Sequence, residues 1–242
     1  MVKVLVLGHT GMLGNCVHKY FSSFKNIETF SVDGRWDDDD FLTEIVNMDV
    51  DYVVNCIGAI PQRTKDFEIN YELPIWLDKN LECRVIHPGT DCEMDNDHYG
   101  ISKVNASDYI KNDGERTKII KTSIIGHELN SSNSLLDWFL NSKDSVSGYT
   151  QAMWNGNTTL EWAHACLQLM NDWDSWETET IIKSYCISKF ELLTEIADIY
   201  DKDIEIKLDA SVVADKCLIK GKQRNPITIQ LKELKEFYGY CC

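Results

Sequence analysis

Three glycines near the N-terminus are spaced to hold a diphosphate group. Gly8, Gly11 and Gly14 occur in Gly8-His-Thr-Gly11-Met-Leu-Gly14, between a β-branched run and a helical pattern. In such a turn the first glycine permits a tight bend, the second lets the backbone approach the diphosphate, and the third lets the helix pack against the sheet. The N–H groups that open the helix carry partial positive charge and attract the anion. The position of these glycines predicts a dinucleotide-binding turn.

The predicted ligand of this turn is NAD(H) or NADP(H). The residues expected to bind it here are Gly8, Thr10, Gly11, Met12, Leu13 and Gly14. Asp33 ends the second predicted strand, about 20 residues after Gly14, where a carboxylate would accept the hydroxyls of the adenosine ribose. An ordinary turn aspartate is the alternative. His9 and Arg35 lie where a 2′-phosphate could be met, so the sequence leaves NADH and NADPH both open.

Tyr99 and Lys103 are suited to acid–base chemistry on a carbonyl group. They are four positions apart, so in a helix their side chains lie one turn apart on one face. A nearby ammonium and the nicotinamide charge favour tyrosinate, lowering the phenol pKa from about 10 toward neutrality. The tyrosine can then donate a proton to a carbonyl oxygen while hydride reaches the carbon. The lysine would also bond the nicotinamide ribose, and Thr90 could bond the same substrate oxygen.

A second tyrosine–lysine pair has the same spacing, Tyr185 and Lys189. Position separates the two pairs. Tyr99 follows the strand that ends near His87, on the carboxyl side of the predicted sheet, where open α/β sheets bind ligands. Tyr185 lies inside a strand-like run, so we expect it to pack.

Alternating strands and helices are expected to position these residues. The predicted strands are Val2–Leu7, Ile27–Val32, Asp51–Ile57, Arg84–His87 and Lys118–Ile125, and the predicted helices run to Phe21 and over Leu73–Leu81 and Gly100–Lys111. This alternation predicts an α/β Rossmann fold with a doubly wound parallel sheet. The run Asp37–Asp40 is expected to be a solvated loop.

The last hundred residues are less regular and predict a smaller C-terminal region. Helical patterns cover Leu135–Leu140, Thr159–Met170, Glu191–Tyr200 and Leu231–Tyr238, and extended ones Tyr185–Ile187 and Ile204–Leu208. We expect an NAD(P)-binding domain over residues 1–150, to which 159–188 returns. Residues 189–242, with parts of 127–158, are expected to bind substrate.

Composition excludes several other classes of protein. The net charge of −15 argues against a nucleic-acid groove, which needs a basic surface. The nine cysteines have irregular spacing and no CxxC pair, so we expect no metal site and thiols kept in a reducing compartment. Neither a signal peptide nor a membrane span is predicted, so the expected location is the cytoplasm.

Taken together, the motifs resemble those of extended short-chain dehydrogenases/reductases. They are the glycine turn, Asn55-Cys56-Ile57-Gly58, Asn70 in INYELP, Thr90-Asp91, Tyr99 with Lys103, and Thr122-Ser123. The resemblance is strongest to the dTDP-4-dehydrorhamnose reductase family and its nucleotide-sugar reductase relatives. The segments TSIIGHEL, SLLDWFL, WNGNTTLEWA and SKFELLTEIADIYDKDIEI extend it over nearly the whole chain.

This resemblance implies NAD(P)H-dependent reduction of a 4-keto nucleotide sugar, a step in making deoxysugar and polysaccharide precursors. It implies catalysis by Thr90, Tyr99 and Lys103. The further cofactor contacts that it implies are Cys56, Ile57, Gly58 and Asn70, and the substrate contacts are Thr90, Asp91, Trp154, Asn155 and Lys216. For Trp154 a structural role is an equal alternative, as is a helix N-cap for Thr158. The oligomeric state is open, with a homodimer as one option.

Departures from the family pattern leave other functions open. Gly89 replaces the usual serine, Thr90 and Tyr99 are only nine residues apart, and Asp215-Lys216 stands where relatives tend to have Asp-Arg. A 4,6-dehydratase is disfavoured, because that class has glutamate directly after Thr-Asp, whereas here Cys92 follows and Glu93 comes one residue late. The alternatives are an epimerase with bound NAD and a non-catalytic NAD(P)-binding module. The regulatory subunit of methionine adenosyltransferase, which resembles the same family, is a module of that kind.

Overall fold

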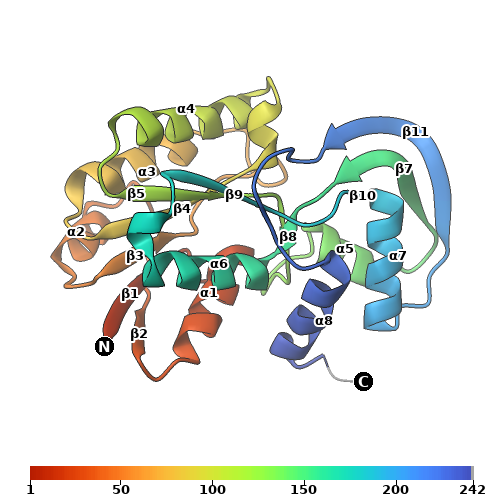
Figure 1. Ribbon diagram of the computed structural model, residues 1–242, viewed down its shortest axis with the longest axis horizontal. Coiled ribbons are helices and arrows are strands. Elements are labelled where there is room, and N and C mark those ends of the chain that lie inside the picture. The colour runs from red at the N-terminus through yellow and green to blue at the C-terminus, as the bar shows by residue number, and fades with distance from the viewer. Residues whose placement is uncertain (241–242) are drawn as a thin grey trace. The chain divides into compact units, whose positions relative to one another are not determined.

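A parallel sheet covered by helices on both sides dominates the computed structural model, which describes residues 1–240 (Figure 1). Its strands, within the described residues, are β1 (Val2–Leu7), β2 (Ile27–Phe30), β3 (Tyr52–Asn55), β4 (Arg84–Gly89), β5 (Thr117–Lys121), β9 (Glu179–Lys183) and β12 (Lys222–Gln223). They are ordered β12-β9-β5-β4-β3-β1-β2. The β1–β2, β1–β3, β3–β4 and β4–β5 pairs are all parallel. The predicted α/β Rossmann fold is confirmed.

The helices that cover this sheet follow its strands in the chain. They are α1 (Met12–Ser22), α2 (Asp39–Asn47), α3 (Ile69–Asn80), α4 (His98–Asp113) and α6 (Thr159–Asn171), with short 3-10 helices η1 (Asp91–Met94) and η2 (Trp173–Ser175). In Figure 1, α3 and α4 lie on one side of the sheet and α1 and α6 on the other. None of the helices within residues 1–240 has the length and apolar character needed to cross a membrane.

Helix α2 corrects the expectation of a solvated loop at Asp37–Asp40. Asp38 is the N-cap of this helix, and its carboxylate accepts a hydrogen bond from the N–H of Asp40. Asp39 and Asp40 occupy the first turn, where negative charge is favoured by the helix dipole. All four residues of the run are exposed, as expected, but Asp39 and Asp40 belong to a helix, whose Phe41 and Ile45 are buried.

Apolar side chains from neighbouring strands form the core of the sheet. Leu5, Val53 and Val85 are fully buried and belong to one cluster with Phe41 of α2 and Leu77 of α3. Their strands have apolar residues on both faces, as parallel strands covered on both sides require. This core fixes the carboxyl ends of β1, β3 and β4, from which the predicted site residues extend.

The C-terminal region has smaller sheets. The strands β10 (Ile187–Ser188), β7 (Val146–Trp154) and β11 (Ile206–Lys216) form one, with β7 antiparallel to β10 and parallel to β11. The strands β6 (Ile124–Ile125) and β8 (Asn157–Thr158) form another, and the helices are α5 (Leu135–Asn141), α7 (Lys189–Tyr200) and α8 (Ile227–Tyr238). The sequence did not predict β7 and β9, and the strand predicted over Lys118–Ile125 divides into β5 and β6. The expectation that Tyr185 packs is wrong: it lies between β9 and β10 and is 58% exposed.

Contacts along the chain define two compact units. The first contains residues 1–121 and 163–180, and the second contains 122–162 together with the described residues from 181 onward. The first segment ends at Lys121 rather than near residue 150, because β6 pairs with β8 and β7 pairs with β10 and β11. Residues 163–180 return to the first unit, within the range 159–188 expected to do so.

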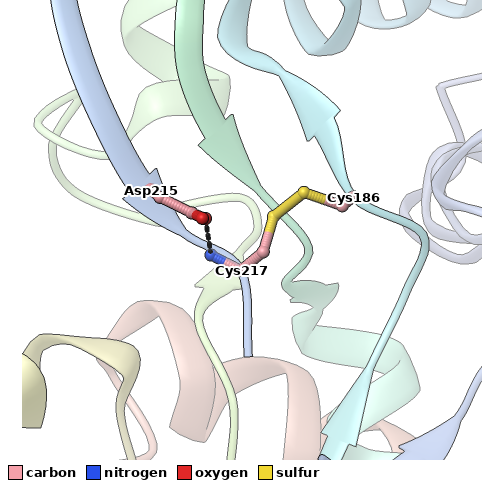
Figure 2. A group of neighbouring side chains, drawn as sticks. All are labelled: Cys186, Asp215 and Cys217. Carbon is pink, nitrogen blue, oxygen red and sulfur yellow. Dashed lines mark hydrogen bonds between the residues drawn. A yellow bond between two sulfur atoms is a disulfide. The ribbon is translucent and has the colours of Figure 1, made fainter. Parts of the chain in front are cut away.

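A disulfide joins Cys186 and Cys217 in the second unit (Figure 2). Their Cα atoms are 5.9 Å apart, although the residues are separated by 31 positions in sequence. Cys186 precedes β10 and Cys217 follows β11, the two strands that flank β7. The N–H of Cys217 also donates to the carboxylate of Asp215 at 2.9 Å. The expectation of unpaired thiols is wrong for these two residues, because strand pairing brings together cysteines whose spacing gave no indication of it.

Candidate active site

The glycine turn has the geometry that the sequence predicts. Gly8 has a φ of +73°, and its carbonyl accepts a hydrogen bond from the N–H of Gly11 at 2.9 Å. A Cβ atom on Gly14 would lie 2.1 Å from the Gly8 carbonyl oxygen, so only glycine allows α1 to pack this closely. Gly11 is the N-cap of α1 and provides no side-chain hydrogen bond to the helix. The first N–H groups of α1 are thus available to an anion.

A cavity of about 640 Å³ lies beside the glycine turn, entirely within the first unit. Asp33 lines it and exposes 92% of its side chain, with its carboxylate 3.7 Å from Nε2 of His9. Arg35 is a second basic residue in the lining. The further carboxylates in the lining belong to Asp37, Asp66, Glu68 and Glu72. The structure therefore brings Gly8, Thr10, Asp33 and Arg35 to one cavity, whose charged side chains are mainly acidic.

Asn55 fixes the beginning of the loop that follows β3. It is fully buried, and its side-chain oxygen accepts from the N–H of Ile57 at 3.0 Å. Its amide nitrogen lies 3.2 Å from Nδ1 of His87 on β4. Burial, followed by the charge of Lys103, holds the pKa of His87 well below its usual value, so this imidazole is neutral. The Cys56 thiol has its pKa raised by burial, so it is protonated.

Asn70 holds the next part of the same loop and connects it to α4. Its side-chain oxygen accepts from the N–H of Ala59 at 2.8 Å, while its amide donates to the Ala59 carbonyl at 3.0 Å and to the Ser102 hydroxyl at 3.1 Å. A Cβ atom on Gly58 would lie 3.2 Å from the Asn70 oxygen and 3.6 Å from Nζ of Lys103. The predicted cofactor residues of this loop thus converge with Lys103.

The short segment between Thr90 and Tyr99 folds into a compact connection. Thr90 caps η1, and Asp97 caps α4 by accepting from the N–H of Gly100 at 2.7 Å. A Cβ atom on Gly100 would lie 2.4 Å from the Asp95 carbonyl oxygen, so glycine permits this close approach. The segment therefore brings the hydroxyl of Thr90 close enough to the phenol of Tyr99 to affect the pKa of that phenol.

The Thr90 hydroxyl has further partners in η1. It donates to the Asp91 carboxylate at 3.1 Å and accepts from the N–H of Cys92 at 3.2 Å. Asp91 is itself buried, with 4% of its surface exposed. The predicted pair Thr90-Asp91 is thus held at one place beside Tyr99.

Tyr99 and Lys103 differ from expectation in their acid–base behaviour. Burial raises the pKa of Tyr99, the charges of Cys92 and Asp91 add to this, and the hydrogen bond with Thr90 acts in the opposite direction. The expected lowering of the phenol pKa is therefore not found in this structure, because burial disfavours the charged form. Burial lowers the pKa of Lys103 to about 8, against the raising effect of Glu93. At neutral pH Tyr99 is protonated and Lys103 carries its charge.

The residues predicted from the second unit have mainly structural contacts. Trp154 is buried, with Nζ of Lys189 4.8 Å from its ring centroid. The Asn155 side chain donates to the carbonyl of Leu218 and accepts from its N–H, both at 2.9 Å. Lys216 pairs with Trp154 in the register of β11 and β7. The polar atoms of the Asn155 side chain are thus engaged by backbone, so a substrate contact at this residue stays a prediction.

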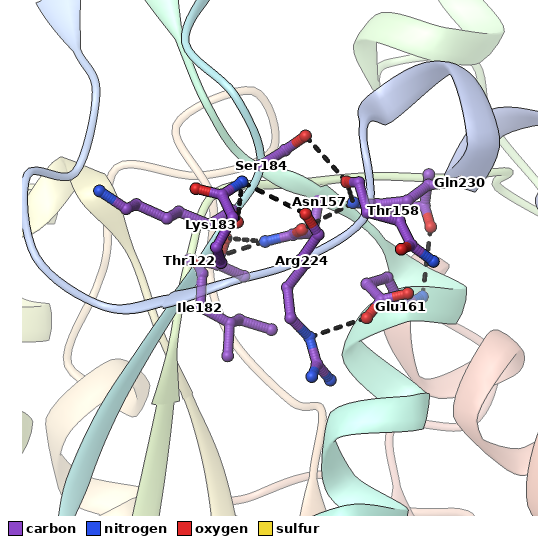
Figure 3. Close-up of polar contacts among 11 residues, drawn as sticks. Thr122, Asn157, Thr158, Glu161, Ile182, Lys183, Ser184, Arg224 and Gln230 are labelled. Atoms are coloured by element: carbon purple, nitrogen blue, oxygen red, sulfur yellow. Dashed lines mark hydrogen bonds and ion pairs between the residues drawn. The ribbon is translucent and has the colours of Figure 1, made fainter.

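Thr158 belongs to a polar network that the sequence did not reveal (Figure 3). Its hydroxyl accepts from the N–H of Glu161 at 3.2 Å, which is the N-cap role considered for it. Its own N–H donates to Gln230 at 2.9 Å, and Gln230 donates to Asn157 at 2.9 Å. Asn157 in turn donates to the Thr122 hydroxyl at 2.9 Å. This network connects α8 to β8 and to Thr122, which lies between β5 and β6.

The sequence assigned no role in the site to Glu93 or Lys121, which form an ion pair in the structure. Thr90 and Glu93 form a capping box. The Thr90 side chain accepts a hydrogen bond from the backbone N–H of Glu93, and the Glu93 side chain accepts one from the backbone N–H of Thr90. The spacing Thr-x-x-Glu could have revealed Glu93, because this pattern is typical of helix N-termini. No local pattern points to Lys121, which reaches Glu93 from β5.

Solved structures provide the comparison with known proteins. A dTDP-4-dehydrorhamnose reductase from Clostridium acetobutylicum matches with 17% identity and a TM-score of 0.74, over 98% of this chain and 99% of that one. The same enzyme from Bacillus anthracis, in complex with NADP, matches with 12% identity and a TM-score of 0.74, over 97% and 98% of the two chains. A UDP-N-acetylglucosamine 4-epimerase from Bacillus cereus matches with 15% identity and a TM-score of 0.67, over 97% and 95%.

The chain has the fold of the dTDP-4-dehydrorhamnose reductases. The family resemblance predicted from the motifs is thus confirmed at the level of the fold. No protein-family model matches the sequence, and a comparison with curated proteins finds no match. At these identities the reductase fold is shared with epimerases as well, so the substrate must be argued from the site.

Proposed function

We propose that this chain is an NAD(P)H-dependent oxidoreductase that reduces a 4-keto nucleotide sugar. The observation that carries the proposal is the approach of α4 to the loop that follows β3: Nζ of Lys103 lies beside Gly58, and Tyr99, one turn earlier on α4, has Thr90 as a neighbour. Thr90 lies at the carboxyl edge of the sheet, directly after β4, and all three residues belong to the unit that also contains the glycine turn. That edge is where open α/β sheets bind their ligands.

The glycine turn and the Gly58 loop are proposed to hold the cofactor. A side chain on Gly14 would collide with the turn, and one on Gly11 would lie 3.3 Å from the Gly8 carbonyl oxygen, facing the place of the diphosphate. Asp33 is proposed to bond the adenosine ribose, and the acidic wall of the cavity favours NADH over the more negative NADPH. The bound cofactor supplies the hydride.

Tyr99 is proposed to supply the proton. Its raised pKa keeps the phenol protonated at neutral pH, which is the form a proton donor needs in the direction of reduction. Thr90 is near enough to this phenol to act on its pKa and would bond the same substrate oxygen. Lys103, charged below about pH 8, would stabilise negative charge that develops there and bond the nicotinamide ribose.

The surroundings of Glu93 disfavour dehydratase chemistry. One carboxylate oxygen of Glu93 accepts from the N–H of Thr90 at 3.0 Å, and the other lies 2.6 Å from Nζ of Lys121. A carboxylate engaged in this way is a poor base for removing a proton from a sugar. An epimerase remains the second candidate, because a UDP-sugar epimerase shares the fold.

A cofactor titration is the first test of this proposal. The wild type should bind NAD(H) or NADP(H), and Gly11→Val should abolish binding because the new side chain blocks the diphosphate. Ser22→Val serves as a control, since Ser22 is exposed at the far end of the same helix α1. Unchanged affinity in a folded Gly11→Val protein would refute the assignment of the turn.

A substrate panel is the second test. UDP- and dTDP-sugars, with and without reduced cofactor, should raise the thermal midpoint if they bind the native state. Oxidation of NAD(P)H with a 4-keto nucleotide sugar would support the reductase. Interconversion of sugars without net cofactor oxidation would show an epimerase. Cofactor binding without any turnover would show a binding module.

A further inference from the structure

A buried ion pair lies against the backbone of Thr90. Oε2 of Glu93 is 2.6 Å from Nζ of Lys121, and the two side chains are 4% and 13% exposed, respectively. Oε1 of Glu93 accepts a hydrogen bond from the N–H of Thr90 at 3.0 Å. The carboxylate therefore links Lys121, at the end of β5, to Thr90, the neighbour that acts on the pKa of Tyr99.

Gly89 leaves the space that this ion pair fills. A Cβ atom at Gly89 would lie 3.1 Å from Oε1 of Glu93, 3.0 Å from Cβ of Lys121 and 2.9 Å from Cγ2 of Ile119. A side chain at position 89 would therefore crowd the carboxylate. The glycine before Thr90 and the ion pair beside it are two parts of one arrangement.

The same carboxylate acts on Lys103. Burial lowers the pKa of Lys103, and the Glu93 charge opposes that effect. The other titratable groups near Lys103 are His87 on β4, which is neutral, and Tyr99 on its own helix, which is protonated. Glu93 is thus a negative charge that helps to keep the lysine protonated near pH 7.

We propose that Glu93, held in place by Lys121, is a positioning residue of the active site. It fixes Thr90 through the backbone N–H and places a negative charge near Lys103. A buried ion pair by itself adds little to stability, because desolvation offsets most of the attraction. Positioning of Thr90 is therefore a better explanation of this ion pair than stability. The expected effect of Glu93 on turnover rests on the proposed function of the protein as a reductase.

The first experiment measures the titration of Lys103 in the cofactor-free protein, with no need for substrate. Lysine labelled with 13C at Cε is followed by NMR from pH 6 to 11, and the Lys103 signal is assigned by its loss in Lys103→Met. The wild type should titrate near pH 8. In Glu93→Gln the midpoint should be lower, because the opposing negative charge is gone while the amide oxygen still faces the N–H of Thr90.

Glu93→Gln removes the partner of Lys121 at 2.6 Å and leaves only Glu179, at 3.8 Å, so this variant risks poor folding. The double variant Glu93→Gln/Lys121→Met removes both charges of the close pair, leaves the carboxylate of Glu179 without Lys121, and is the second variant in which the Lys103 titration is measured. Lys121 is not among the groups that shift the pKa of Lys103, so the midpoint should again be lower. Glu191→Gln is the matched control, since Glu191 forms the same kind of capping box with Ser188 on α7. An unchanged Lys103 midpoint in a folded Glu93 variant would overturn the inference.

The second experiment measures turnover once a substrate is found. Glu93→Ala should lower kcat about tenfold or more, because Thr90 is no longer held in place. Cofactor affinity should change little at pH 6, where Lys103 keeps its charge, and Glu93→Gln should recover most of the kcat because it keeps an acceptor for Thr90. If only the stability falls and kcat stays at the wild-type value, the residue is merely structural. If the wild type turns over no 4-keto sugar, the proposed function fails, and the Lys103 titration still decides the inference.

Discussion

The glycine turn and the region around Asn155 are built in opposite ways. The turn is made within one short stretch, where Gly8, Gly11 and Gly14 contact one another directly. Around Asn155 the contacts join distant positions: Asn155 bonds Leu218, which is 63 residues away. The nearby disulfide spans 31 residues, and the bond between Asn157 and Gln230 spans 73. Local contacts fix the first region and long-range contacts fix the second.

This difference decides what each region can tolerate. Near the turn, a single functional side chain can be substituted without loss of the fold, because short-range hydrogen bonds hold the backbone. In the second region, each contact holds two distant segments together, and its loss frees both. We therefore expect substitutions of the exposed groups that face the cavity beside the glycine turn to change function, and substitutions around Asn155 to change stability.

The largest expected effect is on catalysis by Tyr99→Phe. Removal of the hydroxyl should lower turnover by about 100-fold to 10,000-fold, since general acid catalysis is lost. The ring still packs against Phe67, with centroids 5.6 Å apart, so folding and cofactor affinity should be kept. Rates of NAD(P)H oxidation check this, with Tyr109→Phe on the same helix as the control. Equal turnover by Tyr99→Phe and wild type would refute the mechanism.

Reduction of the Cys186–Cys217 disulfide should give the next largest effect, on stability. Opening a loop of this length lowers the free energy of unfolding by about 3–4 kcal/mol in the chain-entropy model. Urea unfolding with and without dithiothreitol measures it, and Cys186→Ser/Cys217→Ser should not respond to the reductant. Cofactor affinity should be unaffected, because the glycine turn lies in the other unit. If the reductant lowers cofactor affinity as strongly as it lowers the free energy of unfolding, the glycine turn and the region around Asn155 do not differ in the way that their contacts predict.

Asn155→Ala should destabilise the second unit by about 2–3 kcal/mol. The change leaves the N–H and carbonyl of Leu218 without their partners, and Leu218 is buried. Hydrogen exchange should show faster opening around Leu218. The exposed Asn133→Ala is the control. Full stability in Asn155→Ala combined with loss of nucleotide-sugar binding would instead assign Asn155 to the substrate.

The smallest expected effect is a change of cofactor preference in Asp33→Ala. Loss of the ribose contact and of one negative charge should move the ratio of NADPH to NADH affinity about tenfold toward NADPH, or about 1.4 kcal/mol. Asp37→Ala, which removes another carboxylate from the same cavity, should change the ratio less. Titration of both cofactors measures this. If neither affinity changes in Asp33→Ala, Asp33 is a turn residue.

Much of the first unit could be predicted from the sequence because its elements are local. The strand Val2–Leu7 was predicted with its observed bounds, and the helices after the glycine turn and over α4 were found within a few residues. The glycine turn could be predicted from the spacing of Gly8, Gly11 and Gly14 alone. The bend, the start of α1 and the close packing of that helix on the turn all depend on residues near one another in the chain. The place of Tyr99 followed from the strand before it. These features depend on residues that are neighbours in the chain.

The tertiary structure alone decided the rest. The disulfide, the bonds of Asn155 and the strand β7 depend on segments that come together only in the folded chain. The protonation of Tyr99 depends on its burial, which reverses the direction expected from a neighbouring lysine. The ion pair of Glu93 requires Lys121 to arrive from another strand and Gly89 to leave room for it. Periodicity and spacing describe one segment at a time, whereas burial and charge at a site are set by every segment that packs around it.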